Sequence, residues 1–565
     1  MKKLLIAFLS LTICGFSCTT ILVTKGATAD GSLFVTHSED DEVGDQRLIH
    51  VPAKDHPPGS KRPIFPTNNQ QYPRTVNSYF TSAYDTQGYP KSKPVGYIDQ
   101  VSHTYAYFDG NYGIMNEHQL AFGECTCASK YEFPTPDSNG RMFDVEELCH
   151  LALERCKTAR EAIQLMGKMA ERYGYYGQGE TLTIVDKKEG WVFEISCTKE
   201  GKGAVWVAQR VPDGEVFVEA NEFRIRDIDP KNSDIMYSKN LFSLAHKYGW
   251  YDKSKARKLD WLRFISPGEY NHPYYSLRRV WRVLSRVNPS LNLSPWVEGG
   301  YTRAYPFSVK PQKKLTLHDV MELHRDFYQG TEFDMTKQGV ASGAFGAPFR
   351  YIGPYDYKPI KKGSIKVAGA WERSISIFYC GYVYVNQVRP HLPDPIGGIT
   401  WFGYNYPYTT CYVPLYCGVY GLPHSYEYCN PHKFSRDMAW WAYNFVANWS
   451  SLKFSYMIKD IRKKQSAIET RERNQIASID QKALSLYHSS PVKARRFLTS
   501  YSVKNADQVL QQWWNLADYL IQKYTDGYIN DPKIGQEVGY PKWWRKKAGY
   551  FNGPTAYQKP SNKKK

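Results

Sequence analysis

The stretch CTTILVTKGATADGS, residues 18–32, decides the fold predicted for this chain. Residues 18–24 are rich in β-branched side chains, residues 25–32 hold turn-forming Gly and Asp, and residues 33–36 again have strand character. The pattern predicts a β-hairpin whose first strand begins at Cys18. Antiparallel counting about the turn places Cys18 opposite a residue between about 38 and 43.

An acidic cluster falls in that window: Glu39, Asp40, Asp41 and Glu42. A carboxylate opposite Cys18 can hold an α-ammonium group on Cys18, or the amino terminus of a substrate. A solvated acidic loop is the alternative interpretation.

The residues before Cys18 have the layout of a cleavable secretory signal. Lys2 and Lys3 precede an apolar stretch over residues 4–16, and small Gly15 and Ser17 stand before Cys18. The apolar stretch is too short to cross a bilayer, and no later stretch approaches 18 apolar residues in a row. The sequence therefore predicts a signal peptide over 1–17, no transmembrane segment, and an exported protein, periplasmic or secreted.

Cleavage before Cys18 has two possible meanings. A free N-terminal cysteine carries a thiol nucleophile next to an α-amino group, which can take the thiol proton and later protonate the leaving amine. A lipoprotein would instead be acylated on the Cys18 thiol and anchored to the envelope. Gly15 at −3 matches the lipoprotein pattern poorly, because a Leu-like residue is usual there.

The composition is that of a folded globular protein. Of 565 residues, 42% are hydrophobic and 23% charged, which is enough chain for a large body plus an appendage. The formal charge is +18, but Lys and Arg are dispersed, so nucleic-acid binding is not predicted. Removal of residues 1–17 leaves 548 residues and a charge of +16.

Strand and helix patterns alternate in blocks through the first part of the chain, as a layered α+β body requires. We expect helices over 143–155 and over 158–173, the second opened by a Thr158–Glu161 capping box. Residues 181–185 and 191–195 predict a hairpin. In an oxidising compartment we expect some pairing among four later cysteines, with connectivity left open: Cys380, Cys411, Cys417 and Cys429.

The pattern changes after Pro431. Ser435 can cap a helix, and residues 431–527 have apolar side chains at helical spacing. Beyond Gly527 we expect a loop and a basic tail that ends in Lys563–Lys565.

The sequence lacks the motifs of several common enzyme and metal-binding classes. HExxH, GxSxG, Walker and CxxC motifs are absent, and Cys125 with Cys127 forms a lone CxC that is too weak for a metal site. No metal and no other cofactor is predicted.

Beyond residues 18–32, several longer segments show a family resemblance. They are NEHQLAFGECT (116–126), LALERCKTAREAI (151–163), GETLTIVDKKEGWVFEI (179–195), EANEFRI (219–225), YSLRRVWRV (275–283), GTEFDMTKQGVASGAFGAPFR (330–350) and WERSISIF (371–378). In these segments the chain resembles the dipeptidase A type of cysteine peptidases within the N-terminal-nucleophile hydrolases, distant relatives of bile salt hydrolase and penicillin V acylase.

The resemblance implies a four-layer αββα sandwich and hydrolysis of dipeptides or related small amides without a metal. It assigns Cys18 as nucleophile, Asp40 as partner of the free amine, and Asn221 as a contributor to the oxyanion hole. From the residues alone, Asn221 is equally well a strand-terminating turn residue. Together with the signal layout and the change of pattern after Pro431, the resemblance divides the chain into a signal peptide at 1–17, a hydrolase domain at 18–430 and a helical region with a basic tail at 431–565.

The chain departs from the family pattern at two places. The acylase branch carries Arg and Asn three and two residues before the aspartate, where this chain has His37 and Ser38. Cys125 replaces the hydroxyl residue that usually follows Gly-Glu. Arg278 and Arg279 match a basic pair of the family, and the sequence leaves open which of them faces the site.

A dipeptidase must also recognise both charged ends of its substrate. Glu117, Glu124 or Asp40 could meet the amine, and Arg278 or Arg279 could bind the carboxylate. For each of these residues a surface charge is the alternative.

Two functions from different classes therefore stand. One is an exported cysteine dipeptidase with Cys18 as N-terminal nucleophile. The other is a non-enzymatic surface lipoprotein that binds glycan or peptide and is lipidated at Cys18. The oligomeric state is not predictable from the sequence.

Overall fold

The structure is a computed structural model of the chain. It describes residues 18–41, 44–67, 70–133, 140–268, 274–297, 299–351, 371–530 and 536–554. The predicted signal peptide at 1–17, Glu42 and the basic tail at 563–565 lie outside the described residues.

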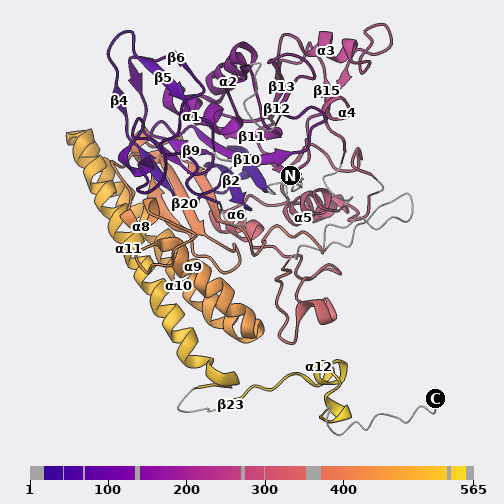
Figure 1. Ribbon diagram of the computed structural model, residues 1–565, viewed down its shortest axis with the longest axis vertical. Coiled ribbons are helices and arrows are strands. Elements are labelled where there is room, and N and C mark those ends of the chain that lie inside the picture. The colour runs from indigo at the N-terminus through magenta and orange to yellow at the C-terminus, as the bar shows by residue number, and fades with distance from the viewer. Residues whose placement is uncertain are drawn as a thin grey trace, which may run out of the picture.

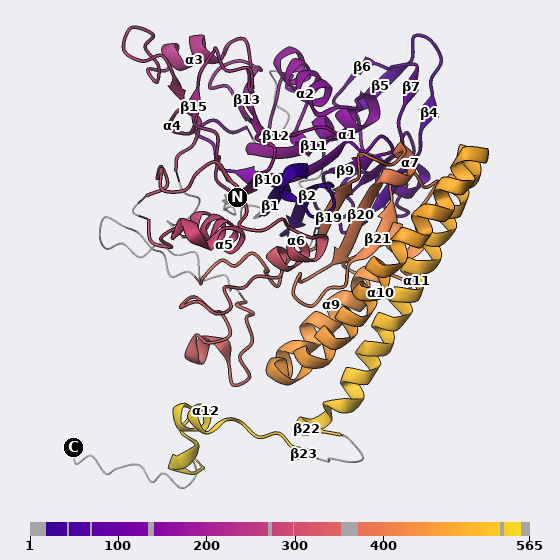
Figure 2. The ribbon, with the colours of Figure 1, turned by 180° about the vertical axis from the view of Figure 1, so that it is seen from behind.

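Two large antiparallel sheets form the centre of the molecule (Figure 1). The first has seven strands in the order β18-β14-β1-β2-β19-β20-β21. Its strands, in chain order, are β1 (Thr20–Val23), β2 (Leu33–Glu39), β14 (Val216–Glu219), β18 (Ser308–Val309), β19 (Tyr382–Val388), β20 (Gly398–Tyr404) and β21 (Val413–Tyr416). Figure 2 shows β1, β2, β19, β20 and β21 side by side.

The second sheet has eight strands in the order β16-β13-β12-β11-β10-β9-β8-β3. They are β3 (Ile49–Val51), β8 (Tyr107–Asp109), β9 (Gly113–Asn116), β10 (Ala121–Cys127), β11 (Gly179–Val185), β12 (Gly190–Cys197), β13 (Ala204–Val211) and β16 (Ile235–Tyr237). Four two-stranded ribbons complete the strands: β4 (Lys54–Asp55) with β7 (His103–Thr104), β5 (Lys61–Ile64) with β6 (Gly96–Asp99), β15 (Asp227–Ile228) with β17 (Leu259–Asp260), and β22 (Tyr528–Ile529) with β23 (Gln536–Glu537).

The two large sheets pack face to face through β1, β2, β10 and β11. The contact is close because the facing residues are small. The Thr20 and Thr183 hydroxyls lie 2.5 Å apart, and a Cβ added to Gly123 would lie 2.2 Å from the carbonyl oxygen of Thr36.

Helices contact the other face of each sheet. In β11, Leu182 and Ile184 pack in one core with α1 (Val145–Arg155) and α2 (Ala159–Tyr173), whereas Val185 belongs to the core between the sheets. The seven-stranded sheet is covered by α5 (Leu277–Val287), α6 (Leu317–His324), α9 (Ala439–Ser450), α10 (Phe454–Ser489) and α11 (Pro491–Lys523). The shorter helices are α3 (Leu241–Lys247), α4 (Trp261–Ile265), α7 (Asp394–Gly397), α8 (His424–Glu427) and α12 (Lys542–Lys547).

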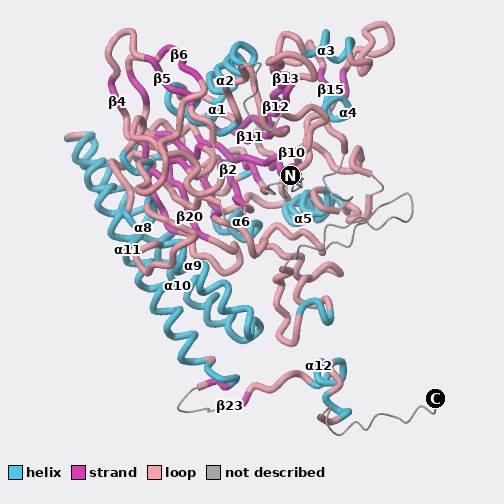
Figure 3. Tube along the Cα trace, in the orientation of Figure 1, coloured by secondary structure: helices cyan, strands magenta, loops and turns pink. Residues whose placement is uncertain are grey.

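Most expected elements are confirmed. The β1–β2 hairpin pairs Leu22 with Val35, and a bridge pairs Thr19 with Ser38, so Cys18 falls opposite Glu39. The Thr158–Glu161 capping box opens α2, and β11 pairs with β12. The mixed α and β composition with antiparallel sheets is as predicted, and the long helices α10 and α11 run along one side of the molecule (Figure 3).

Three expectations at the level of elements are wrong. Ser435 caps no helix, because its hydroxyl accepts from the amide of Asp437 and α9 begins only at Ala439. The chain after Gly527 is not all loop, because it contains β22, β23 and the short α12. All ten cysteines of the described residues are free thiols, and the Cys380 and Cys417 thiols donate to the carbonyls of Tyr382 and Asp394.

Within the described part of the chain, no helix has both the length and the apolar character needed to cross a membrane.

Candidate functional site

Cys18 lies directly before β1, at the point where both neighbouring strands end. β14 and β2 flank β1 and run antiparallel to it, with Thr20 opposite Glu219 and Thr19 opposite Ser38. Because antiparallel neighbours finish where the central strand starts, residues after β14 and after β2 gather around Cys18. The sheet thereby brings Asn221 and Asp40 to the same edge.

The Cys18 side chain is completely buried. Its carbonyl oxygen accepts from Arg279 Nη1 at 2.8 Å and from the Cys125 thiol at 3.2 Å. Burial raises the pKa of Cys18 well above its usual value, and the nearby carboxylates of Glu124 and Glu39 raise it further. In this environment the thiol is protonated at neutral pH, so its use as a nucleophile requires a base.

Asn221 adopts a left-handed backbone conformation, with φ of 59°, two residues after the end of β14. Its amide donates to Cys125 Sγ at 2.9 Å, its side-chain Nδ2 donates to the Thr126 carbonyl at 2.7 Å, and its Oδ1 accepts from Arg279 Nη2 at 2.6 Å. Asn tolerates this backbone region better than most residues. The turn that ends the strand therefore also holds the Asn221 amide against Cys125, whose thiol donates to the Cys18 carbonyl.

Asp40 follows the last residue of β2 and is buried. Its carboxylate accepts from the Ser38 hydroxyl at 3.2 Å and forms an ion pair with Arg373. Burial raises the pKa of Asp40, although the charge of Arg373 opposes this shift. Ser38 in turn accepts from the Thr19 amide at 3.2 Å, which ties Asp40 to the start of β1.

The two arginines of α5 have different roles. Arg279 is buried and bonds both the Cys18 carbonyl and the side chain of Asn221. Arg278 packs over the rings of Phe333 at 3.8 Å and Tyr274 at 4.0 Å, and pairs with Glu372. Adjacent residues of a helix point about 100° apart, so only one of the pair can face the site.

His37 and Glu39 point from β2 toward Cys18. The thiol, a ring nitrogen of His37 and a carboxylate oxygen of Glu39 lie within 4.8 Å of one another. His37 Nδ1 lies 2.9 Å from the Glu124 carbonyl oxygen, and Nε2 lies 3.0 Å from the Glu39 carboxylate. Burial alone would lower the pKa of His37, but the hydrogen bond and charge of Glu39 raise it overall.

This thiol, imidazole and carboxylate are the donors that could hold a metal ion in the described part of the chain. The His37–Glu39 hydrogen bond already accounts for their proximity. The CxC pair is not arranged for a metal, because Cys127 Sγ donates to Glu219 at 2.9 Å while Cys125 faces Cys18.

Sequence reasoning found part of this group. It singled out Cys18, Asp40 and Asn221, and the structure brings all three together. It did not single out Arg373 or the His37–Glu39 pair as site groups, although Arg373 lies in the family-like segment 371–378. Glu117 is elsewhere: its carboxylate accepts from Arg495 of α11 and from the Ala106 amide.

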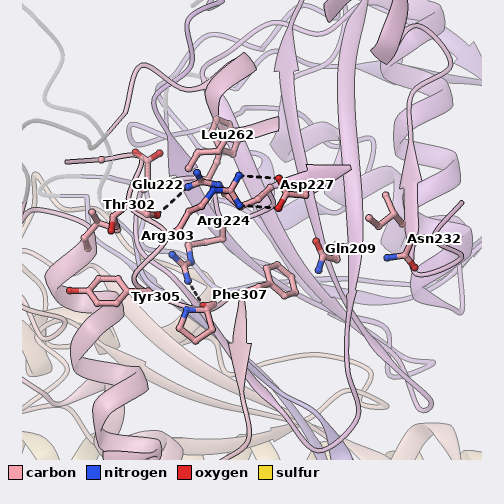
Figure 4. A pocket seen from close by; sticks show the side chains of 16 residues that line it. Gln209, Glu222, Arg224, Asp227, Asn232, Leu262, Thr302, Arg303, Tyr305 and Phe307 are labelled. Atoms are coloured by element: carbon pink, nitrogen blue, oxygen red, sulfur yellow. Dashed lines mark hydrogen bonds and ion pairs between the residues drawn. The ribbon is translucent and has the colours of Figure 1, made fainter. Parts of the chain in front are cut away.

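A cavity of about 310 Å³ is lined in part by the residues that directly follow Asn221 (Figure 4). Its lining includes Glu222, Arg224 and Leu277, but Cys18, Asp40 and Asn221 do not line it. The cavity and the Cys18 group are therefore different sites that share a segment and a helix.

Comparison with known proteins gives a consistent result. The sequence model described as peptidase family C69 matches residues 17–467. A protein of Salmonella dublin named "Probable dipeptidase" is 28% identical over 407 residues, which cover 71% of this chain and 81% of that protein. A "Probable dipeptidase" of Latilactobacillus sakei is 23% identical over 522 residues, 90% of this chain and 95% of that protein. A "Dipeptidase" of Bifidobacterium longum is 23% identical over 462 residues, 76% of each chain.

Proposed function

This chain belongs to peptidase family C69, and from that premise we propose that it is an exported dipeptidase in which Cys18, freed as the N-terminal residue, attacks the peptide bond. The observation that carries the proposal is the convergence on Cys18 of Arg279, Asn221 and Asp40, which come from distant parts of the sequence. The relatives named as dipeptidases support a dipeptide as substrate.

The proposal includes the fold. Two face-to-face sheets with helices on both outer sides, and a nucleophile at the start of an inner strand, are what the αββα sandwich of N-terminal-nucleophile hydrolases would require. In that arrangement removal of residues 1–17 creates the α-amino group that the reaction uses.

The first step forms a thioester. The α-amine takes the Cys18 thiol proton directly or through a water, the sulfur attacks the carbonyl carbon, and the peptide C–N bond breaks as the leaving amine receives that proton. Water then hydrolyses the thioester, and the thiol regains a proton. Asp40 holds the α-ammonium group in place, since its carboxylate already reaches Ser38 beside Thr19.

Negative charge develops on the carbonyl oxygen during attack. We assign the Asn221 backbone and side-chain amides as its donors, and a donor of this kind is worth about 2.7–4 kcal/mol of transition-state stabilisation. In the described state they donate to Cys125 Sγ and to the Thr126 carbonyl, so each exchanges that partner for the substrate oxygen. Arg279 holds Asn221 in position through its Oδ1.

His37 supplies positive charge next to the nucleophile. The Glu124 carbonyl can only accept, so Nδ1 of His37 must donate, and Nε2 faces a carboxylate. This pattern favours the doubly protonated ring, which stabilises a thiolate on Cys18. His37 thus replaces the charge that Arg carries in the acylase branch.

Dipeptide hydrolysis by the mature protein tests the proposal. We expect free Cys18 at the N-terminus by sequencing and intact mass, and loss of turnover in Cys18→Ala produced with the same N-terminus. Cys156→Ala is the matched control, because Cys156 is buried at the end of α1, away from the site. Unchanged turnover in Cys18→Ala, or an acylated Cys18, would reject the mechanism.

A further inference from the structure

The cavity of about 310 Å³ beside the Cys18 site has the size of a small-molecule pocket (Figure 4). Its walls come from the segment after Asn221, the first turn of α5, α4 and the segment 300–307. Three arginines line it, and their partners differ.

Two of the three arginines are neutralised by acidic residues. Arg303 makes two hydrogen bonds of 2.9 Å to Asp227 and another of 2.9 Å to Asp260. Arg226 reaches Asp260 at 3.4 Å and donates to the backbone carbonyls of Tyr301 and Thr302. In these contacts the charges of Arg303 and Arg226 are balanced by those of Asp227 and Asp260.

Arg224 is the exception. Only 7% of it is exposed, and its Nη2 donates to the Pro306 carbonyl at 2.6 Å. Among the described residues its Nε has no hydrogen-bond partner, and no carboxylate forms an ion pair with it. A buried guanidinium without a carboxylate partner is costly, so the cavity presents a cation that lacks its anion.

The nearest acidic side chains do not supply that anion. Burial lowers the pKa of Arg224, and the charges of Glu219, Glu194 and Glu222 oppose the shift without forming an ion pair with its guanidinium. Burial raises the pKa of Glu219 well above its usual range and that of Glu194 to about 7. Both shifts favour the neutral acid over the carboxylate.

The rest of the wall indicates what the anion is attached to. Phe223, Leu262 and Leu277 are buried apolar side chains of the lining. Glu222 also lines the cavity and accepts from the Ser266 hydroxyl at 2.9 Å. Outside the groups whose charges are balanced, the lining offers Glu222, Arg224 and these apolar side chains, a set that matches the ammonium group, the carboxylate and the side chain of an amino acid.

We propose that this cavity binds a free apolar α-amino acid, with its carboxylate on Arg224 and its side chain against Leu262 and Leu277. The source of that ligand rests on the proposed function, because hydrolysis of a dipeptide releases free amino acids. Arg224 is three residues after Asn221, and Leu277 is two residues before Arg279. The cavity and the Cys18 site therefore share two elements, the segment after β14 and α5.

Calorimetric titration of the full protein tests the binding site with three probes: L-leucine, 4-methylpentanoate and L-leucinamide. We expect one equivalent of leucine to bind, 4-methylpentanoate to bind more weakly because it lacks the ammonium group, and leucinamide not to bind. Leucinamide binding as tightly as leucine would overturn the proposal, as would inorganic phosphate that displaces leucine at equal concentration.

Variants locate the site. Arg224→Met should weaken leucine binding by about tenfold or more, because a charge-assisted contact is lost. Arg257→Met is the matched control, since Arg257 is exposed, pairs with Asp229 and does not line the cavity. If thermal unfolding shows that Arg224→Met is not folded, leucine binding is measured with Arg224→Lys instead. We expect an intermediate loss of affinity, because lysine keeps the charge but lacks the planar guanidinium.

Two further outcomes separate this inference from the proposed function. Leucine binding retained in Cys18→Ala and lost in Arg224→Met supports the cavity even if no dipeptide is hydrolysed. Binding that is lost in Cys18→Ala and kept in Arg224→Met places the amino acid at the Cys18 site and overturns the inference.

Discussion

Arg279 and Arg278 show how much depends on which side of a helix a residue faces. The guanidinium of Arg279 holds the Cys18 carbonyl and Asn221 Oδ1, whereas that of Arg278 lies in a cage of aromatic rings. The two residues have the same chemistry and adjacent positions, so each serves as the control for the other.

We predict that Arg279→Ala lowers kcat/KM for dipeptides by about a hundredfold or more, because both the proposed nucleophile and the proposed oxyanion donor lose their support. Arg278→Ala should mainly lower the thermal unfolding temperature, and it should reduce kcat/KM less than Arg279→Ala does. Steady-state kinetics and thermal unfolding of both variants check this. A greater loss of activity in Arg278→Ala would contradict the assignment.

A second prediction at this scale concerns the charge of His37. The raised pKa of His37 keeps the ring protonated to higher pH, and a positive ring favours the Cys18 thiolate. We expect the pH midpoint of Cys18 alkylation by iodoacetamide to rise by about one unit or more in His37→Gln. In His37→Arg, where the charge remains, it should stay near that of the wild type. Equal midpoints in all three proteins would show that the charge of His37 does not affect the pKa of the Cys18 thiol.

Among the elements, the contact between the β1–β2 hairpin and β10 sets the geometry of the site. Gly123 of β10 lies against the carbonyl of Thr36 and the hydroxyl of Thr20, with no room for a Cβ. The sheets can approach this closely only because the facing residues are small.

We predict that Gly123→Ala destabilises the protein by about 1–3 kcal/mol, because the added methyl group overpacks the interface. Activity should fall as well, since Cys125 lies on the same strand two residues later. Gly203→Ala is the control, because the nearest atom to its added Cβ is 3.7 Å away. Urea denaturation measures both, and equal stabilities would show that the sheets can separate at no cost.

Across the whole molecule, α6 connects the sheets to the C-terminal helices. Glu322 of α6 pairs with Arg325 at 2.7 Å and with Arg462 of α10 at 3.0 Å. Burial would raise the pKa of Glu322, but these two arginines lower it from 4.5 to about 2. The folded state therefore favours the ionised carboxylate.

The sign of the pH dependence follows from this shift. The stabilising contribution is complete above pH 4.5, the unfolded value, and is lost as the pH falls through about 2. We predict that Glu322→Gln costs about 1–2 kcal/mol at pH 7, a figure reduced for partial exposure, and that the difference shrinks toward pH 3. Denaturant unfolding at both pH values tests this, with exposed Glu332→Gln as control. A difference that does not change with pH would mean that the ion pairs are not its cause.

The sequence by itself determined what depends on near neighbours along the chain. The β1–β2 hairpin, the position of Cys18 opposite the acidic cluster and the α2 capping box follow from turn residues, β-branched side chains and a short-range hydrogen bond. The family resemblance singled out Cys18, Asp40 and Asn221 as site residues. Ser435 does not cap a helix, because its hydroxyl accepts a hydrogen bond from the nearby Asp437 amide. The periodicity of apolar residues does not predict such a contact.

Only the tertiary structure decided what depends on residues far apart in the chain. It placed β14 beside β1, brought Arg279 and not Arg278 to Cys18, joined Arg373 to Asp40, and left Arg224 without a carboxylate partner in a cavity. The partners in these contacts come from segments that lie far apart in the sequence. The spacing of residues fixes local backbone geometry, but the partner of a buried charge depends on which segments the sheets bring together.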